Sequence, residues 1–402
     1  MLPLRVLAVC ALVFCAELGQ AMLTPLLPQI GRAFALGAAE TGIVLSVATL
    51  ATLVAAVPAG LLAERIGALR VSIMAGTVIA ASAGVQALAT DFPTFLCGRA
   101  LFGVGFAAIW TAGVAVVAGP GAPRSAVAAT MAAGGLAHVV GPPLSGVLSD
   151  AVARSSPFWL LAAGAAAVAL LAAGAPAGAP EPAPAPGLRA VARAAGHDPA
   201  LRSATVLIAL IGVLTALVPL VVPLLLDREG FSSGAIGAVF GLGAAVWVAA
   251  SALAVRAGAR AVTIGVAAAG VALLAAASLM PIVTLAAPCL VAFVLMRAAL
   301  QAPLSTISYD LGAQGARNAG VAIGTAMGML NFVWAAGATV APLVGGAVLA
   351  GAGARWVFVL LAVACAAAAL SLRPGRHRYA GMSGERGGIL DAGPSPWPSR
   401  GA

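Results

Sequence analysis

Two titratable side chains stand inside long apolar runs of this sequence, where a charge is costly. Glu17 is the only carboxylate that we place deep in such a run, since the other eleven of the twelve acidic residues fall in loops, at helix ends or near the C-terminus. A carboxyl group held away from water resists ionisation, which lets it take up and release protons near neutral pH. His138 lies mid-way along another apolar run, and imidazole titrates in the same range. These residues predict proton exchange.

Two arginines also lie inside apolar runs. Arg99 is roughly seven residues inside its run, and Arg297 is similarly placed in the second half of the chain. A cation at that depth costs at least about 2.5 kcal/mol, so each should face the protein interior and have a partner. We expect Arg99 to tune the proton affinity of Glu17. Alternatives stay open: a permanent Glu17–Arg99 ion pair, arginines that only bind helix-end carbonyls, and a His138 that is merely a hydrogen-bonded interior residue.

Other chemistries have no recognisable pattern here. The five cysteines (Cys10, Cys15, Cys97, Cys289 and Cys365) all fall in apolar segments, without CxxC or CxxH spacing, so neither disulfides nor a metal site is expected. No nucleophile, metal cluster or phosphate loop has the spacing of an enzyme. We therefore expect a protein that is no enzyme and has no cofactor beyond a proton gradient.

The composition points to a membrane protein. Of the 402 residues, 62% are hydrophobic and only 8% are charged, whereas about a quarter of the residues of a soluble domain are charged. The charges punctuate apolar runs that mostly reach the ~20 residues a membrane helix needs. We predict an all-α membrane protein with twelve transmembrane helices in two pseudo-symmetric six-helix bundles. The expected spans are 6–28, 41–62, 71–89, 93–117, 126–148, 157–174, 203–226, 235–254, 261–280, 283–304, 319–348 and 355–372.

The arginines set the expected orientation. All 21 basic residues are Arg, and with both termini in the cytoplasm fifteen of them fall on inner segments against four on outer ones. This is the positive-inside bias, so we assign the net charge of +9 to topology and expect no nucleic-acid partner. The expected location is the inner (plasma) membrane.

The chain reads as two copies of one unit. GLLAERIGALR at 60–70 aligns with SALAVRAGAR at 251–260, and GPPLSG at 141–146 aligns with APLVGG at 341–346. The Pro- and Ala-rich stretch 175–187 separates the copies. The expected domains are an N-terminal bundle (1–174), a cytoplasmic linker (175–202), a C-terminal bundle (203–373) and a disordered cytoplasmic tail (374–402).

Twelve helices in two repeated halves, with GLLAERIGALR after the second helix, resemble the major facilitator superfamily up to residue 373. Gly60, Arg65 and Gly67 match its loop signature, Glu64 replaces the usual Asp, and only Arg70 remains of the basic residues that follow. We expect Gly60 to allow close helix approach and the charges to form a latch at the inner surface. The resemblance implies a loop that stabilises one side of an alternating-access cycle; a plain topogenic turn is the alternative. The fourth helix, RALFGVGFAA at 99–108, is similar to a further family element.

The fifth helix resembles the exporters of that superfamily. AHVVGPPLSG at 137–146 is similar to a signature of drug/proton antiporters, with Gly141, Pro142 and Gly146 matching. Two consecutive prolines bend the helix and small residues let a neighbour pack against the bend, which favours a hinge or seal. A proline kink without directional meaning is the alternative. ELGQAMLTPLLPQI at 17–30 also resembles the first helix of twelve-helix drug exporters, which implies a proton-site role for Glu17.

These features together predict a proton-coupled exporter of small amphipathic molecules. Five polar or aromatic residues are expected to line its central cavity, although simple packing explains each equally well: Gln20, Trp247, Gln301, Asn331 and Trp334. The expected partners are a small-molecule substrate, protons and the lipid bilayer, and the chain is expected to be a monomer. A proton-coupled importer or symporter of a metabolite, and a non-transporting membrane sensor or scaffold, remain alternatives.

Overall fold

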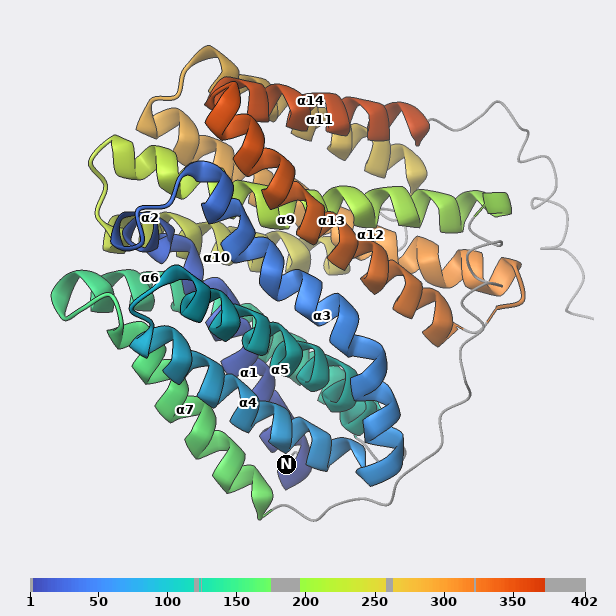
Figure 1. Cartoon of the computed structure of the whole chain (residues 1–402). Coiled ribbons are helices and arrows are strands. Elements are labelled where there is room, and N and C mark those ends of the chain that lie inside the picture. The colour runs from blue at the N-terminus through green and yellow to red at the C-terminus, as the bar shows by residue number, and fades with distance from the viewer. Residues whose placement is uncertain are drawn as a thin grey trace, which may run out of the picture.

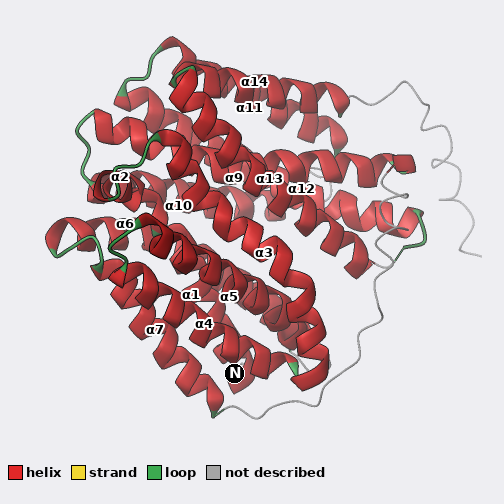
Figure 2. Cartoon of the chain, in the orientation of Figure 1, coloured by secondary structure: helices red, strands yellow, loops and turns green. Residues whose placement is uncertain are grey.

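A computed structural model describes residues 3–118, 123, 125–174, 196–257, 263–321 and 323–372. Within these ranges every regular element is a helix, and short loops join the helices (Figure 2). Twelve of the helices are long and apolar enough to cross a membrane. Two of the sequence predictions lie outside the described residues: the Pro- and Ala-rich stretch at 175–187 and the disordered tail at 374–402.

The helices form two bundles (Figure 1). The first contains α1 (Leu4–Ala21), α2 (Leu23–Ala33), α3 (Ala38–Ile66), α4 (Ala68–Leu88), α5 (Phe92–Ala118), α6 (Ser125–Ala151) and α7 (Ser156–Ala173). The second contains α9 (Pro199–Arg228), α10 (Ser233–Ala257), α11 (Ile264–Val283), α12 (Ala287–Asn318), α13 (Ile323–Gly351) and α14 (Ala354–Ser371).

The packing of the helices repeats between the bundles. In the first bundle α3 packs on α5 and α4 on α7, and in the second α10 packs on α12 and α11 on α14. The contact of α1 with α6 likewise recurs as α9 with α13. This correspondence confirms the two pseudo-symmetric six-helix bundles expected from the sequence.

The first expected span is bent. It consists of α1 and α2, which meet at Met22. Pro25 has no backbone N–H, and its ring crowds the carbonyl of residue 21, so the α1 hydrogen-bond ladder cannot continue past this point. The bend sets α2 against α6, α9 and α10, so that this short helix contacts both bundles.

The tenth span was predicted too short. We expected it to end at 304, whereas α12 continues to Asn318. Ile307, Leu311 and Ala316 are buried along this extension. Gly315 brings it close to α9, where an added Cβ would meet the amide nitrogen of Leu201 at 2.5 Å, and Gly312 lies against α13, where an added Cβ would meet Cδ1 of Leu330 at 2.5 Å. An amphipathic helix outside the apolar region therefore replaces the expected loop.

The two bundles touch through two seams at one end of the molecule. The first seam joins residues 38–49 of α3 to residues 338–346 of α13, and the second joins residues 139–150 of α6 to residues 233–241 of α10. We call this the contact end. The ribbons of the bundles diverge toward the opposite end, which holds the start of α1 and the α3–α4 turn (Figure 1).

Candidate functional site

Glu17 lies inside the first bundle and is 8% exposed. Its Oε1 accepts a hydrogen bond of 2.6 Å from Nε1 of Trp110 on α5. Its Oε2 lies 3.6 Å from Nδ1 of His138 on α6. Gly134 makes room for the side chain, since a Cβ there would meet Cγ of Glu17 at 3.3 Å. Three helices thus meet at this carboxyl group.

His138 is the partner of Glu17 that reaches the surface. Its side chain is 46% exposed, against 11% for that of Glu17. Nδ1 also lies 3.2 Å from the carbonyl oxygen of Gly134, one turn earlier on α6. The sequence proposed both residues as proton-exchanging groups, and the structure places them side by side. The exposure of His138 does not fit the alternative of a merely interior histidine.

Arg99 does not pair with Glu17. Only two salt bridges occur among the described residues, and neither involves Arg99. Its Nε donates to the carbonyl oxygen of Val44 and its Nη2 to Oε1 of Gln20, both at 3.4 Å, and its guanidinium lies over the Phe102 ring at 4.8 Å. Eleven residues of α5 separate Arg99 from Trp110, which is about 16 Å of helix rise. The expected direct tuning of Glu17 by Arg99 therefore lacks a contact.

Trp110 is a site residue that sequence reasoning missed. It ends a ladder of side chains on one face of α5: Arg99, Phe102, Phe106 and Trp110, spaced by three and then four residues. Adjacent ring centroids lie 5.9 and 6.5 Å apart. The spacing of three and four residues is visible in the sequence, and it predicts that Arg99 and this tryptophan share one face of the helix.

Arg297 repeats the situation of Arg99 in the second bundle. Its Nη1 donates to Oε1 of Gln301 at 2.7 Å, while its Nε is buried without a hydrogen-bond partner among the described residues. Buried Arg99 and half-buried Arg297 therefore bind an amide side chain each, and only Arg99 also reaches a backbone carbonyl. Among the described residues, neither arginine has an acidic partner, and neither binds backbone carbonyls alone.

The α3–α4 turn closes in a single residue. Gly67 has φ of 98°, a conformation that glycine adopts without strain. A Cβ on Gly60 would meet only Thr111 at 3.4 Å, an ordinary contact, so close approach does not require a glycine there. Glu64 and Arg65 are exposed and make no side-chain hydrogen bond within the described residues, and Arg70 reaches only the carbonyl of Ile66 at 3.5 Å. The latch expected here is not engaged in this conformation.

The export-type element of α6 lies at the second seam. Gly146 faces the carbonyl oxygen of Ser233, and the carbonyl oxygen of Pro142 faces Gly237, both at distances that leave no room for a Cβ. Gly141 instead packs on α1, where a Cβ would meet Leu18 and Ala21 at 3.2 Å. Ser145 Oγ donates to the carbonyl of Met22 at the α1–α2 bend at 2.9 Å.

The first seam repeats this arrangement at equivalent positions. Gly42 faces the carbonyl oxygen of Pro342, and Gly346 faces that of Ala38. On α3 and α10, Gly42 corresponds to Gly237 and Ala38 to Ser233, each pair 195 residues apart. On α6 and α13, Pro142 corresponds to Pro342 and Gly146 to Gly346, each pair 200 residues apart. Hydrogen bonds add to this seam: Ser46 donates to the carbonyl oxygen of Thr339 at 2.7 Å, and Thr339 to Oγ1 of Thr49 at 3.0 Å.

A polar cluster joins the bundles beside the second seam, and sequence reasoning missed it. Asp150 accepts from the amide of Gly234 at 2.7 Å and from Gln29 at 3.1 Å, and Gln29 also donates to Ser233 at 2.8 Å. Arg32 and Asp227 form a salt bridge nearby. Positions 32 and 227 also differ by 195, so opposite charges stand at equivalent positions of the repeat. That was the available signal, because equivalent residues near a twofold axis meet.

The five expected cavity residues have separate side-chain partners or packing contacts within the described residues. Gln20 binds Arg99, Gln301 binds Arg297, and Asn331 accepts from the hydroxyl of Tyr309 at 3.3 Å. Trp247 is half-buried, and so is Trp334, whose carbonyl oxygen packs against Gly212. No side-chain hydrogen bond within the described residues joins any two of the five. Their role in lining a cavity stays a prediction.

The family model described as Major Facilitator Superfamily matches residues 9–326. The chain belongs to the major facilitator superfamily. Its membership, with the twelve helices, makes it a transporter and not an enzyme. No curated protein matches its sequence significantly.

Solved transporters of this superfamily share the fold. A bacterial homologue of the human lysosomal transporter Spinster, inward-facing and unoccupied, is 16% identical with a TM-score of 0.74, over 92% of this chain and 96% of that one. The human organic anion transporter MFSD10 (TETRAN) is 21% identical with a TM-score of 0.66, over 92% and 99%. A mutant of the nucleoside transporter NupG is 13% identical with a TM-score of 0.72, over 92% and 98%.

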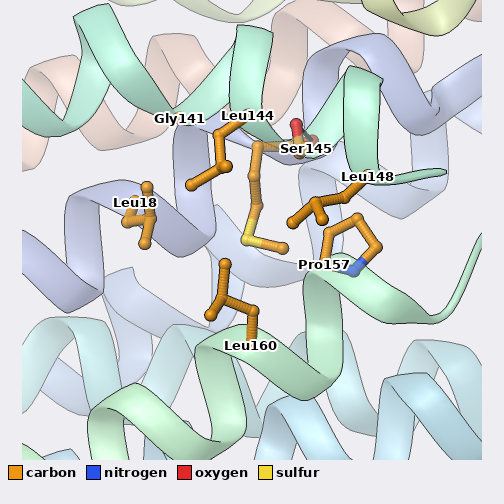
Figure 3. A pocket seen from close by; sticks show the side chains of 8 residues that line it. Leu18, Gly141, Leu144, Ser145, Leu148, Pro157 and Leu160 are labelled. Atoms are coloured by element: carbon orange, nitrogen blue, oxygen red, sulfur yellow. Dashed lines mark hydrogen bonds between the residues drawn. The ribbon is translucent and has the colours of Figure 1, made fainter. Parts of the chain in front are cut away.

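A small crevice of this transporter lies between α1, α6 and α7 (Figure 3). It is lined by Leu18, Met22, Gly141, Leu144, Ser145, Leu148, Pro157 and Leu160. Its lining is almost entirely apolar, and none of the expected cavity residues borders it. We therefore assign it to helix packing around the bend at Met22.

Proposed function

We propose that the chain is a proton-coupled exporter of small amphipathic molecules that works by alternating access of its two bundles. The observation that carries the proposal is Glu17, a buried carboxylate whose side-chain contacts are Trp110 and His138. With no arginine in contact, its charge is not permanently compensated. A carboxyl group in this position exchanges protons more readily than one held in an ion pair.

The proposed direction rests on the second seam. Gly146 and Pro142, which match the exporter element, make backbone contacts to α10 in the conformation described here. With the termini in the cytoplasm of an inner-membrane protein, as the arginine distribution favours, the contact end faces outward. The conformation is then inward-facing, ready to take substrate from the cell. We further propose a monomer in the lipid bilayer, with protons and a small-molecule substrate as its partners and no nucleic acid.

The test is efflux of a fluorescent amphipathic dye from energised cells that express the chain. We expect efflux that a protonophore abolishes and that Glu17→Gln reduces to background. Glu40→Gln is the matched control, because Glu40 is an exposed carboxylate in the first turn of α3. Expression of each variant is checked by immunoblot.

Dye efflux that persists with a protonophore and in Glu17→Gln would refute the proton coupling. If no dye moves, the amphipathic substrate class is wrong. The assay then moves to radiolabelled metabolites. Organic anions and nucleosides come first, because two structurally similar proteins are named as transporters of these compounds. Accumulation of one of these inside right-side-out vesicles under an inward proton gradient would establish import instead.

A further inference from the structure

The two oxygens of Glu17 have chemically different partners. Oε1 receives the indole N–H of Trp110 at 2.6 Å. An indole nitrogen only donates hydrogen bonds and never accepts one. A proton on Oε1 would turn this oxygen into a hydroxyl group, a much weaker acceptor, and so weaken the bond from the indole N–H. Oε1 is kept as an acceptor while Trp110 stays in place.

Oε2 faces a group that both gives and takes protons. Nδ1 of His138 lies 3.6 Å from Oε2 and 3.2 Å from the carbonyl oxygen of Gly134. Both neighbours are acceptors when Glu17 is ionised, so Nδ1 carries a hydrogen in that state. The half-exposed imidazole ring thus stands between a buried carboxylate oxygen and the exposed surface of α6.

We propose that Trp110 is a positioning residue that reserves Oε1 of Glu17 as an acceptor, so that the coupling proton enters and leaves at Oε2 by way of His138. This inference rests on the proposed function. In the loading step the proton leaves Nδ1 of the imidazolium and binds Oε2. The products are a neutral imidazole and a neutral carboxyl group, and release reverses the step.

Few other charged groups surround this pair. Of the helices packed on α1, α6 contributes His138 beside Glu17 and Asp150 at the contact end, and α5 contributes Arg99, which reaches Gln20 one turn away from Glu17. The charged residue of α4 is Arg70, near the α3–α4 turn, and α7 has none. α2 carries only Arg32, which pairs with Asp227 at the contact end. Trp110 and His138 are thus the direct controls on the carboxyl group.

The positioning role is tested by titrating Glu17 itself in purified protein. The infrared band of its protonated carboxyl group is identified by its loss in Glu17→Gln and followed against pH. Trp110→Phe keeps the ring ladder with Phe106 and removes only the donor. Because that donor favours the ionised form, we expect the midpoint of the band to move to higher pH by about one unit. Trp356→Phe, at an exposed position of α14 in the other bundle, should leave it in place.

The outcomes separate this inference from the proposed function. A midpoint that stays in place in Trp110→Phe overturns the positioning role and leaves Glu17 as the proton site. A wild-type protein with no titrating Glu17 band overturns both. A moved midpoint, accompanied by an equal shift in the pH profile of dye transport in proteoliposomes, supports both. The pH profile matters because a merely structural tryptophan would lower activity at every pH.

The route through His138 has its own readout. After a rapid drop in pH, the infrared band of protonated Glu17 should appear in wild-type protein. The rate of its appearance should be at least about tenfold lower in His138→Gln, since a positioned acid or base commonly accelerates proton transfer by about 10² or more. The matched control is His197→Gln, an exposed histidine before α9. Equal rates in the wild type and His138→Gln would overturn the route, because protons would then reach Oε2 from elsewhere.

Discussion

Adding one methyl group to Gly346 should weaken the conformation described here. A Cβ at this position lies 2.6 Å from the carbonyl oxygen of Ala38 and 3.2 Å from Cα of Ala39. Both obstacles are backbone atoms of α3, which cannot turn aside as a side chain would. Relief requires α3 and α13 to separate by about half an ångström, which forfeits a quarter or more of the local dispersion energy.

The size of the effect follows from that overlap. Overpacking by one methyl group commonly costs about 1–3 kcal/mol. Because the crowding exists only while the first seam is closed, the cost acts on one state of the transport cycle. The ratio of closed to open contact ends should fall by about 5- to 150-fold. Gly328→Ala is the matched control, since Gly328 is on the same helix and an added Cβ would meet nothing within 4 Å.

The assay is an electron paramagnetic resonance distance across the contact end. Spin labels at Val152 and Glu229, which are exposed and belong to different bundles, report on its opening in a background without the native cysteines. We expect a short distance in the parent and in Gly328→Ala, and a large population of longer distances in Gly346→Ala. An unchanged distribution in Gly346→Ala would refute the reasoning, because the seam would then not depend on glycine.

Three further substitutions probe single contacts. Asp150→Ala removes the acceptor for the amide of Gly234 at the start of α10, so it should cost about 1 kcal/mol and lengthen the same spin-label distance. Asp91→Ala, which caps α5 within one bundle, should lower the melting temperature without changing the distance. Asp198→Ala should destabilise the start of α9 by about 1 kcal/mol, because its carboxylate accepts from the amide of Leu201, as measured by thermal unfolding in detergent; an unaltered melting temperature would count against this cap. Gly67→Ala should cost about 1–2 kcal/mol through its φ of 98°, whereas Gly84→Ala, in open space on α4, should melt like the parent; equal melting of the two variants would contradict the strain.

The twelve spans were predictable because the bilayer imposes a length on apolar runs. The same criterion failed at α12, where the Ser-, Gly- and Asp-containing segment after residue 304 has the composition of a loop. Gly315 instead allows that segment to lie against α9, and Gly312 allows it to lie against Leu330 of α13. The sequence shows that these residues are small, and only the packing shows that a neighbouring helix uses the space.

The sequence predicted how deep in the membrane the residues of the candidate site lie, but not which side chains they contact. The sequence places Glu17 and Arg99 in apolar runs, and an ion pair between them satisfied both in the simplest way. Depth says nothing of which way a side chain points, and Arg99 turns toward Val44 and Gln20. Trp110 was missed because a tryptophan in an apolar helix has no signal of its own. The residue at Oε1 of Glu17 emerged only when α1 and α5 were placed together.

The two seams match in backbone geometry and differ in chemistry. The first seam is closed by glycines, carbonyl oxygens and hydroxyl groups, none of which changes charge over the physiological pH range. The second adds Asp150, whose carboxylate accepts two of the hydrogen bonds around Gln29 and the start of α10. Removal of this carboxylate would therefore loosen one seam and spare the other. The bundles would then separate at the α6–α10 seam and pivot about the α3–α13 seam.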